Sequence, residues 1–339
     1  MLNSTVVHRM GVLILAALFM LVSPFVAAAD KPLVFVSVSP QKYLLERIAG
    51  NQVDIEVLVQ PGHNPHSYDP SARQMARLAR AQMLMTTGVP FEQVWLPRIR
   101  RLNKDMVLVD TLGAAEEAFA AHPTHQGEPE HGAHHEDEHD DHHDHDHDHD
   151  HDHGEHKSEH HDDVMAHEDN DYHQHDHDGD DPHVWMDPIK ALSQARIMAD
   201  ALKGLVPEAA ESFEGRYQQL SDELTALDHE IHEQFEAYEG RTFMVFHPAW
   251  GHFAARYHLE QIAIEYQGKS PSARQLVKLS EKAKAENIKV ILVQEQFNQK
   301  PAERIAESIG ARVVKADPLP EDLPKAIREL SQQLLESWQ

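Results

Sequence analysis

The feature that most constrains the fold is an alternation of short apolar runs with amphipathic helical patterns. Several such runs precede residue 113, and a second series follows Gly240. Continuous β-branched runs separated by helices are typical of strands that are buried on both faces of a parallel sheet. We therefore predict an α/β fold class with two (β/α) lobes. The predicted strands lie at 33–38, 53–59, 83–87, 106–111, 241–247, 261–265, 289–295 and 312–317.

A long, rigid helix is predicted between the lobes, over residues 207–239. Pro207 suits a first helical turn, and Gly240 suits a helix end. About 30 helical residues would extend ~45 Å, enough to pass along both lobes. The lobes are then expected at 30–206 and 240–339, with little relative motion. The apolar stripe that predicts one buried face consists of Phe213, Tyr217, Leu220, Leu224, Leu227, Ile231 and Phe235.

A His/Asp-rich insertion is predicted within the first lobe, over residues 122–182. It holds 23 Asp plus Glu against one basic residue, so it carries −22 of the formal net charge of −27. So few apolar side chains cannot offset the entropy of ordering, and we expect a disordered loop. The remaining sequence has no basic stripe, which argues against nucleic-acid binding.

The first 29 residues have the pattern of a cleavable signal peptide. Arg9 precedes an apolar run that ends in small residues at Ala27 and Ala29, so cleavage before Asp30 is expected. An uncleaved membrane anchor is the alternative, but the run is short for a span. The chain contains no Cys, hence neither a disulfide framework nor a thiol for lipid attachment. We expect a periplasmic protein.

Outside the insertion, possible metal ligands stand where predicted strands end. The carboxyl ends of parallel strands are where α/β sheets bind ligands. The loop PGHNPHSYDP follows the strand at 53–59 and presents His63 and His66. A solvated loop histidine is the alternative for each. His66 is the stronger candidate, and His63 is a second-rank one that could replace another ligand.

Three further candidates are His183 in DPHVWMDP, His247 in TFMVFHPAW and Glu295 in KVILVQEQF. Burying an imidazole or a carboxylate costs free energy unless the group is paired or binds a metal. A hydrogen-bonded core histidine or a salt-bridged carboxylate is therefore the alternative reading. Together with His66, however, these residues would complete a tetrahedral zinc site in the cleft between the lobes.

The motifs PGHNPHSYDP, DPHVWMDP, VFHPAWGHFAARY and ILVQEQF occur in this order around the predicted helix and insertion. The whole mature chain resembles the zinc-binding subgroup of the metal-specific solute-binding proteins of ABC importers, the ZnuA-like proteins. The resemblance implies three histidine ligands at His66, His183 and His247. It matches Glu295 to an acidic position that some members use as the fourth ligand, where others use water.

The resemblance also implies a binding protein rather than an enzyme. Its cargo would be Zn²⁺, and its partner would be an inner-membrane ABC permease with its ATPase. We expect a monomer. A manganese carrier of the same architecture is one alternative, although Mn²⁺ favours more oxygen ligands than this set offers. A zinc-dependent hydrolase with Glu295 as general base is another, but the chain has no HExxH motif.

The histidines of the insertion are expected to form weak auxiliary metal sites. A disordered segment loses chain entropy on binding and offers many nearly equivalent ligand sets. Tethering could still raise the local zinc concentration, so a scavenging or sensing role is weighed against that of a solvated spacer. The repeat HHDHDHDHDHDH places these residues at His142, His143, His145, His147, His149, His151 and His153.

Overall fold

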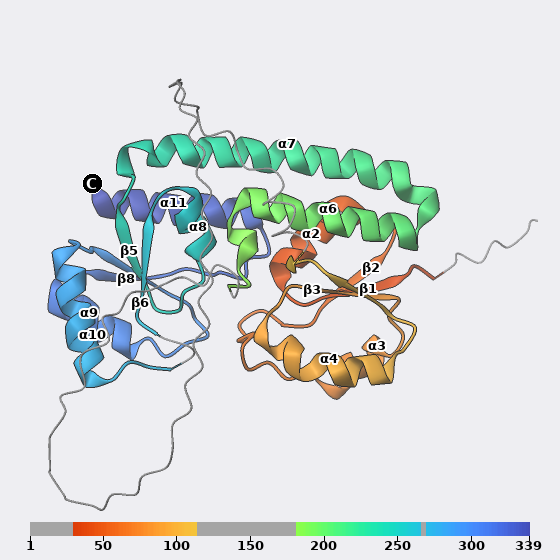
Figure 1. The fold of residues 1–339 in the computed structure, drawn as a ribbon, viewed down its shortest axis with the longest axis horizontal. Helices are drawn as coiled ribbons and strands as arrows, with labels where there is room; N and C mark the ends of the chain where they lie inside the picture. Colours follow the sequence, from red (N-terminus) through yellow and green to blue (C-terminus); the bar gives the residue numbers. More distant parts are fainter. Residues whose placement is uncertain (1–29, 114–180, 266–268) are drawn as a thin grey trace, which may run out of the picture. The chain divides into compact units, whose positions relative to one another are not determined.

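The computed structural model describes residues 30–113, 181–265 and 269–339 (Figure 1). Two parallel sheets of four strands, flanked by helices, make up this part of the chain. The predicted α/β fold class with two (β/α) lobes is confirmed. The predicted signal peptide and nearly all of the predicted insertion lie outside the described residues. No helix in the described ranges combines the length and apolarity needed to cross a membrane.

The N-terminal sheet has the strand order β2-β1-β3-β4. Its central strands β1 and β3 are fully buried, whereas β2 and β4 at the edges are partly exposed. This difference explains why the central strands are the most continuously apolar. The strands are β1 (Leu33–Val36), β2 (Asp54–Val57), β3 (Met83–Thr86) and β4 (Val107–Asp110), and the helices between them are α2 (Ser39–Ala49), α3 (Ala72–Leu78) and α4 (Pro90–Leu102).

The C-terminal sheet repeats this topology with the order β6-β5-β7-β8. Its central strands β5 and β7 are again fully buried. The strands are β5 (Thr242–Val245), β6 (Glu260–Ala263), β7 (Val290–Val293) and β8 (Arg312–Lys315). The helices are α8 (Gly251–Arg256), α9 (Ala273–Ala285), α10 (Lys300–Ile309) and α11 (Leu323–Trp338).

In each lobe, one helix begins with the same short sequence. The sequence Ser-Ala-Arg-Gln occurs at 71–74 before α3 and at 272–275 before α9. In both places the serine hydroxyl accepts the backbone N–H of the glutamine, and the glutamine side chain accepts the serine N–H. This reciprocal cap satisfies two backbone donors that have no partner within the helix.

The long helix α7 (Ala210–Phe235) confirms the predicted connection between the lobes. Short 3₁₀ turns, η2 (Pro207–Ala209) and η3 (Glu236–Tyr238), extend it at both ends. The helix packs against α2 and α6 (Pro188–Leu205) of the first lobe and against α11 of the second (Figure 1). The predicted stripe is fully buried except at Tyr217, over whose ring the Arg196 guanidinium lies at 4.2 Å.

An ion pair ties α7 to the second lobe. Asp228 of α7 is buried, and its carboxylate accepts hydrogen bonds from Arg256 Nε at 2.8 Å and from Arg256 Nη2 at 2.5 Å. The Tyr257 hydroxyl donates to the same carboxylate at 3.2 Å. One continuous apolar core includes residues of both sheets, such as Phe35 and Phe243, and also Leu227 and Tyr257, the chain neighbours of Asp228 and Arg256. The pair therefore lies where the two lobes share a core.

Candidate metal centre

Three of the predicted ligands come together in the structure. His66 lies in the loop between β2 and α3, His183 directly precedes the 3₁₀ turn η1 (Val184–Met186), and His247 follows β5 by two residues. One ligand nitrogen of each ring lies within 4.8 Å of the others. This is the one group of three or more possible metal ligands found within the described residues.

The spacing of the rings fits a single ion. Nε2 of His66 and Nε2 of His247 are 3.1 Å apart. The centroid of the His183 ring lies 5.5 Å from that of His247 and 6.4 Å from that of His66. Two nitrogens bound to one tetrahedral zinc at 2.0–2.1 Å would stand ~3.3 Å apart. The nitrogens of His66 and His247 thus already have about the spacing of two ligands of one ion, and the third nitrogen lies within 4.8 Å of them.

Carboxylates orient two of the three rings. His247 Nδ1 lies 2.8 Å from Glu265 Oε1, and His183 Nδ1 lies 2.6 Å from Asp181 Oδ1. An ionised carboxylate only accepts, so both Nδ1 atoms carry hydrogen and donate it. The lone pair of each ring is then on Nε2, which makes Nε2 the nitrogen available to a metal. A histidine whose second nitrogen bonds a carboxylate is the common arrangement around bound metals.

The electrostatics of the site favour the neutral form of two of the imidazoles, those of His66 and His247. Burial, followed by the charges of His247 and His183, lowers the pKa of His66 to about 4. Burial also lowers the pKa of His247, although Glu265 opposes this effect. Burial raises the pKa of Asp181, but the charge and hydrogen bonds of His183 outweigh it and hold the pKa at about 2. At neutral pH, His66 and His247 are thus in the form that binds metals.

The backbone around each ligand is held by specific hydrogen bonds. The Asn64 side chain accepts the N–H of His66 at 2.8 Å, which fixes the turn of the loop. The buried indole of Trp185 donates to the carbonyl of Pro318 at 2.7 Å and so ties the His183 segment to the second lobe. The Phe297 ring stacks on His247 with centroids 4.8 Å apart and covers one face of the imidazole.

Glu295 does not join the group, contrary to the expectation. Its carboxylate binds Lys315 Nζ at 2.6 Å, and both side chains are about two-thirds exposed, at 66% and 65%. The preceding residue, Gln294, is fully buried and bonds both the N–H and the carbonyl of His247, at 3.3 and 2.9 Å. Gln294 directly follows β7 and faces inward, whereas Glu295 lies in the turn that comes next and faces solvent.

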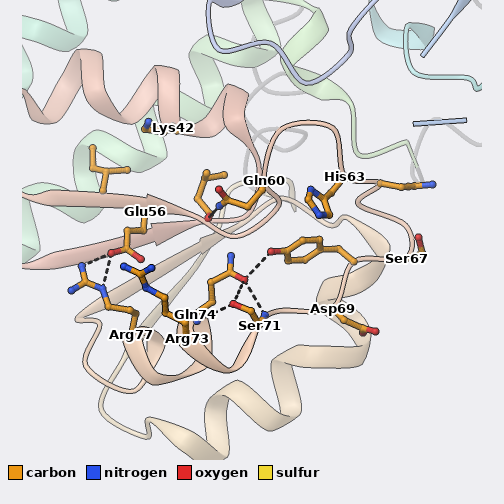
Figure 2. A pocket seen from close by; sticks show the side chains of 14 residues that line it. Lys42, Glu56, Gln60, His63, Ser67, Asp69, Ser71, Arg73, Gln74 and Arg77 are labelled. Atoms are coloured by element: carbon orange, nitrogen blue, oxygen red, sulfur yellow. Dashed lines mark hydrogen bonds and ion pairs between the residues drawn. The ribbon is translucent and has the colours of Figure 1, made fainter. Parts of the chain in front are cut away.

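His63 also lies apart from the three histidines. It lines a polar pocket of about 870 Å³ on the first lobe, together with Gln60, Tyr68 and Gln74 (Figure 2). Its Nδ1 is 3.3 Å from the carbonyl of Pro61, and its ring meets the edge of Tyr68 with centroids 5.7 Å apart. The histidines of the His-Asp repeat at 142–153, called the HD repeat below, lie outside the described residues.

Sequence reasoning missed two residues that orient the rings. Asp181 falls within the predicted insertion, although it is the first described residue after the gap at 114–180. Glu265 ends the run QIAIE, which the pattern predicts only as a strand. A register argument could have found Glu265: β5 and β6 pair with a constant offset of 18, so residue 265 stands level with His247. The argument can be made only when it is known that β5 and β6 are neighbours in the sheet.

The sequence from residue 34 to residue 336 matches the family model described as ZnuA, zinc-uptake complex component A, periplasmic. The chain belongs to this family. A crystal structure of a ZnuA superposes with a TM-score of 0.70 at 29% identity, covering 91% of this chain and 99% of that one. A zinc-bound ZnuA deletion mutant that lacks 138–173 gives 0.69 at 30% identity, covering 91% and 98%.

Curated relatives include the zinc-binding lipoprotein AdcA of Streptococcus pneumoniae serotype 4, which is 27% identical over 90% of this chain. The zinc-binding protein AdcA of Streptococcus pyogenes serotype M3 is 24% identical over 87%. The chain spans about half the length of these relatives, 54% and 52%. The family and these names describe metal binding and uptake, which confirms the prediction of a binding protein rather than an enzyme.

Proposed function

We propose that the chain captures Zn²⁺ in the periplasm and delivers it to an ABC importer, whose inner-membrane permease and ATPase are its partners. The observation that carries this proposal is the convergence of His66, His183 and His247 within 4.8 Å. The orientation of two of these rings by carboxylates supports a preformed site, since such a site loses little entropy on binding. The family and the names of the relatives support zinc as cargo and uptake as the process.

The three histidines supply three ligands, and we propose that water fills the fourth position. Three imidazoles with one solvent position form an ordinary tetrahedral zinc shell. The ion pair of Glu295 with Lys315 supports water over Glu295. An open position also suits a carrier, because the ion must leave the protein when it reaches the permease.

Manganese is the competing cargo. Its harder ion favours oxygen ligands, whereas the group here consists of three nitrogens and the carboxylates near it bond Nδ1 atoms instead. A manganese-bound periplasmic metal-binding protein from Candidatus Liberibacter asiaticus has a TM-score of 0.65 at 16% identity, a likeness that concerns the fold alone. The donor set therefore favours zinc.

A hydrolytic function lacks support in the described residues. Three histidines and a water would resemble a catalytic zinc site, but such a site needs a general base within reach of the water. The two carboxylates that contact the rings, Asp181 and Glu265, are hydrogen-bonded to ligand imidazoles. Glu295, the candidate base, is ion-paired at the surface. Carriage of the ion is thus the better-supported function.

The same proposal extends to segments outside the described residues. We propose that residues 1–29 direct export and are then removed, and that the HD repeat collects zinc weakly for the main site. The crystal structure of a 138–173 deletion mutant of a ZnuA has zinc bound, which supports a zinc site outside the deleted residues in a protein of this family. We further propose that the protein acts as a monomer.

The decisive experiment is metal binding by residues 30–339 and by alanine variants of His66, His183 and His247. Competition with a chromophoric chelator gives the affinity, and metal analysis gives the stoichiometry. Zinc at a thousandfold excess over the dissociation constant should stabilise the wild type by about 4 kcal/mol. Each variant should lose most of this stabilisation.

The matched control is His229→Ala, because His229 is an exposed histidine of α7 outside the group. This variant should keep the full zinc shift in thermal unfolding. If all three ligand variants also keep it, the proposed site is not the zinc site. Tighter binding of Mn²⁺ than of Zn²⁺ by the wild type would overturn the choice of cargo.

A further inference from the structure

His252 is a buried histidine that is not among the three clustered rings. It lies on α8, and only 2% of its surface is exposed. Its Nε2 is 3.0 Å from the carbonyl oxygen of Asp181, and its Nδ1 is 2.8 Å from Nζ of Lys190 on α6. Both ring nitrogens therefore have partners. Lys190 belongs to α6, and Asp181 belongs to the segment that precedes η1 and α6.

The partners decide how the hydrogens of His252 are placed. A carbonyl oxygen can only accept, so Nε2 of His252 carries the hydrogen and donates it to Asp181. Nδ1 then has a lone pair, which accepts a hydrogen from the Lys190 ammonium. The imidazole thus acts as a rigid bridge that connects α6 to the backbone of Asp181 through a side chain of α8.

Asp181 is the residue that orients His183. Its Oδ1 accepts both the backbone N–H of His183, at 3.0 Å, and the Nδ1 hydrogen, at 2.6 Å. Any shift of the Asp181 backbone therefore moves the carboxylate that aims the His183 ring. His252 holds that backbone through the carbonyl.

Gly251 brings α8 close to the same carboxylate. A Cβ atom built on Gly251 would stand 3.0 Å from Asp181 Oδ2 and 3.7 Å from Gln261 Nε2. The first distance is shorter than an ordinary van der Waals contact, so a side chain at this position would push against the carboxylate. The glycine thus permits the approach that lets His252 reach the carbonyl of Asp181.

We propose that His252 is a positioning residue for the metal site, acting on His183 through Asp181. It aims the His183 ring without contacting the ion, and it does so from the second lobe. The proposal rests on the proposed zinc function, in which His183 is a ligand. Partners in the outer shell of metal sites typically change the affinity 10–100-fold when they are replaced.

The test compares His252→Gln, His252→Asn and His252→Leu in the chain 30–339. The Gln amide can place an N–H donor near the position of Nε2, whereas the shorter Asn amide falls short of it and Leu has no donor. Zinc affinity is measured by chelator competition, and the visible spectrum of the Co²⁺-loaded protein reports the coordination geometry. We expect near wild-type affinity for Gln, and affinity at least ~10-fold lower for Asn and Leu.

The Co²⁺ spectrum separates positioning from general stability. A purely structural role would lower the melting temperature of the metal-free protein and leave the spectrum of the loaded protein unchanged. We expect a changed spectrum in His252→Leu and a wild-type spectrum in His252→Gln. Gly251→Ala keeps the His252 side chain and should also weaken zinc binding, so it serves as the second test if His252→Leu does not fold.

Three outcomes overturn the proposal. Wild-type affinity in both His252→Leu and Gly251→Ala would show that the bridge does not influence the site. Equal loss in the Gln and Leu variants would show that the hydrogen bond to Asp181 is not the cause. An unchanged spectrum in His252→Leu would mean that His252 stabilises the fold alone. Absence of zinc binding in the wild type would instead contradict the proposed function.

Discussion

Nδ1 of His247 lies 2.8 Å from Oε1 of Glu265, and both side chains are buried. This contact fixes the tautomer of His247, with the lone pair on Nε2. It also makes that nitrogen a more basic ligand for a metal. Glu265→Gln keeps the size of the side chain and an acceptor oxygen but removes the negative charge. We expect zinc affinity to fall about 10–100-fold, as measured by chelator competition. Glu260→Gln, an exposed position on β6, is the matched control and should bind like the wild type. Equal affinity in both variants would contradict the role of Glu265.

Glu295→Gln should leave zinc affinity within about twofold of the wild type, because surface changes away from the site have small effects. The carboxylate of Glu295 is engaged with Lys315 at the surface, so its charge should contribute little to binding at the histidines. Isothermal titration of both proteins with a zinc-buffered solution measures the difference. A loss comparable to that of His66→Ala would make Glu295 the fourth ligand after all.

Removal of residues 122–177 should leave one tight zinc ion per chain and eliminate only weaker sites. A tract with many nearly equivalent ligands offers no single fixed geometry, so we expect it to bind zinc more weakly than the three clustered histidines. Metal analysis after dialysis at low free zinc gives the tight stoichiometry, and titration gives the weak sites. The idea fails if the shortened chain no longer retains its tight ion.

The stability of the protein should depend on the ionisation of Glu92. Burial raises the pKa of Glu92 to about 6, above its ordinary value of 4.5, even though the carboxylate accepts the N–H groups of Thr87 and Gly88. The folded state therefore binds the proton more tightly than the unfolded state does. This contribution to stability is present below pH 4.5 and is lost as the pH rises through 6, a change of about 2 kcal/mol.

Glu92→Gln should abolish that pH dependence. The free energy of unfolding of the variant, minus that of the wild type, should rise by about 2 kcal/mol between about pH 4.5 and pH 7.5. Urea titrations of both proteins at several pH values provide the measurement. A difference that stays constant across this range would mean that Glu92 has an ordinary pKa.

The pair formed by Asp228 and Arg256 should be costly to break. Arg256→Ala leaves the buried Asp228 carboxylate without its cation, and we expect a loss of about 3–5 kcal/mol. Arg328→Ala breaks the exposed pair with Glu230 and should cost less than about 1 kcal/mol. Urea unfolding of the metal-free proteins tests both. Similar losses in the two variants would show that burial of the first pair is unimportant.

The sequence predicted the parts of the fold that depend on local pattern. Apolar continuity located the buried strands β1, β3, β5 and β7, and the spacing of seven apolar residues located α7. The three histidines were found because each stands at a strand end or beside core-type neighbours. These signals are local, and they persist whichever strands later become neighbours.

The rest of the site depends on direction and register, which a single sequence does not contain. Glu295 looked like a strand-end ligand, but Gln294 takes the inward direction and Glu295 faces solvent. Glu265 is level with His247 only because β6 pairs with β5. Asp181 follows an acidic tract, and the composition of that tract gave no reason to single out this one carboxylate. Only the structure shows that it contacts His183.

The side chain of Gln294 has a consequence for how His247 is held. Its amide accepts the His247 N–H and donates to the His247 carbonyl, as the peptide group of an adjacent strand would. The ladder between β5 and β7 is in effect prolonged by one rung made from a side chain. The side chain thus supplies the two hydrogen bonds of a neighbouring strand and holds the main chain of His247 two residues past the end of β5. The main chain and the ring of His247 are therefore anchored separately, the main chain by the amide of Gln294 and the ring by the carboxylate of Glu265.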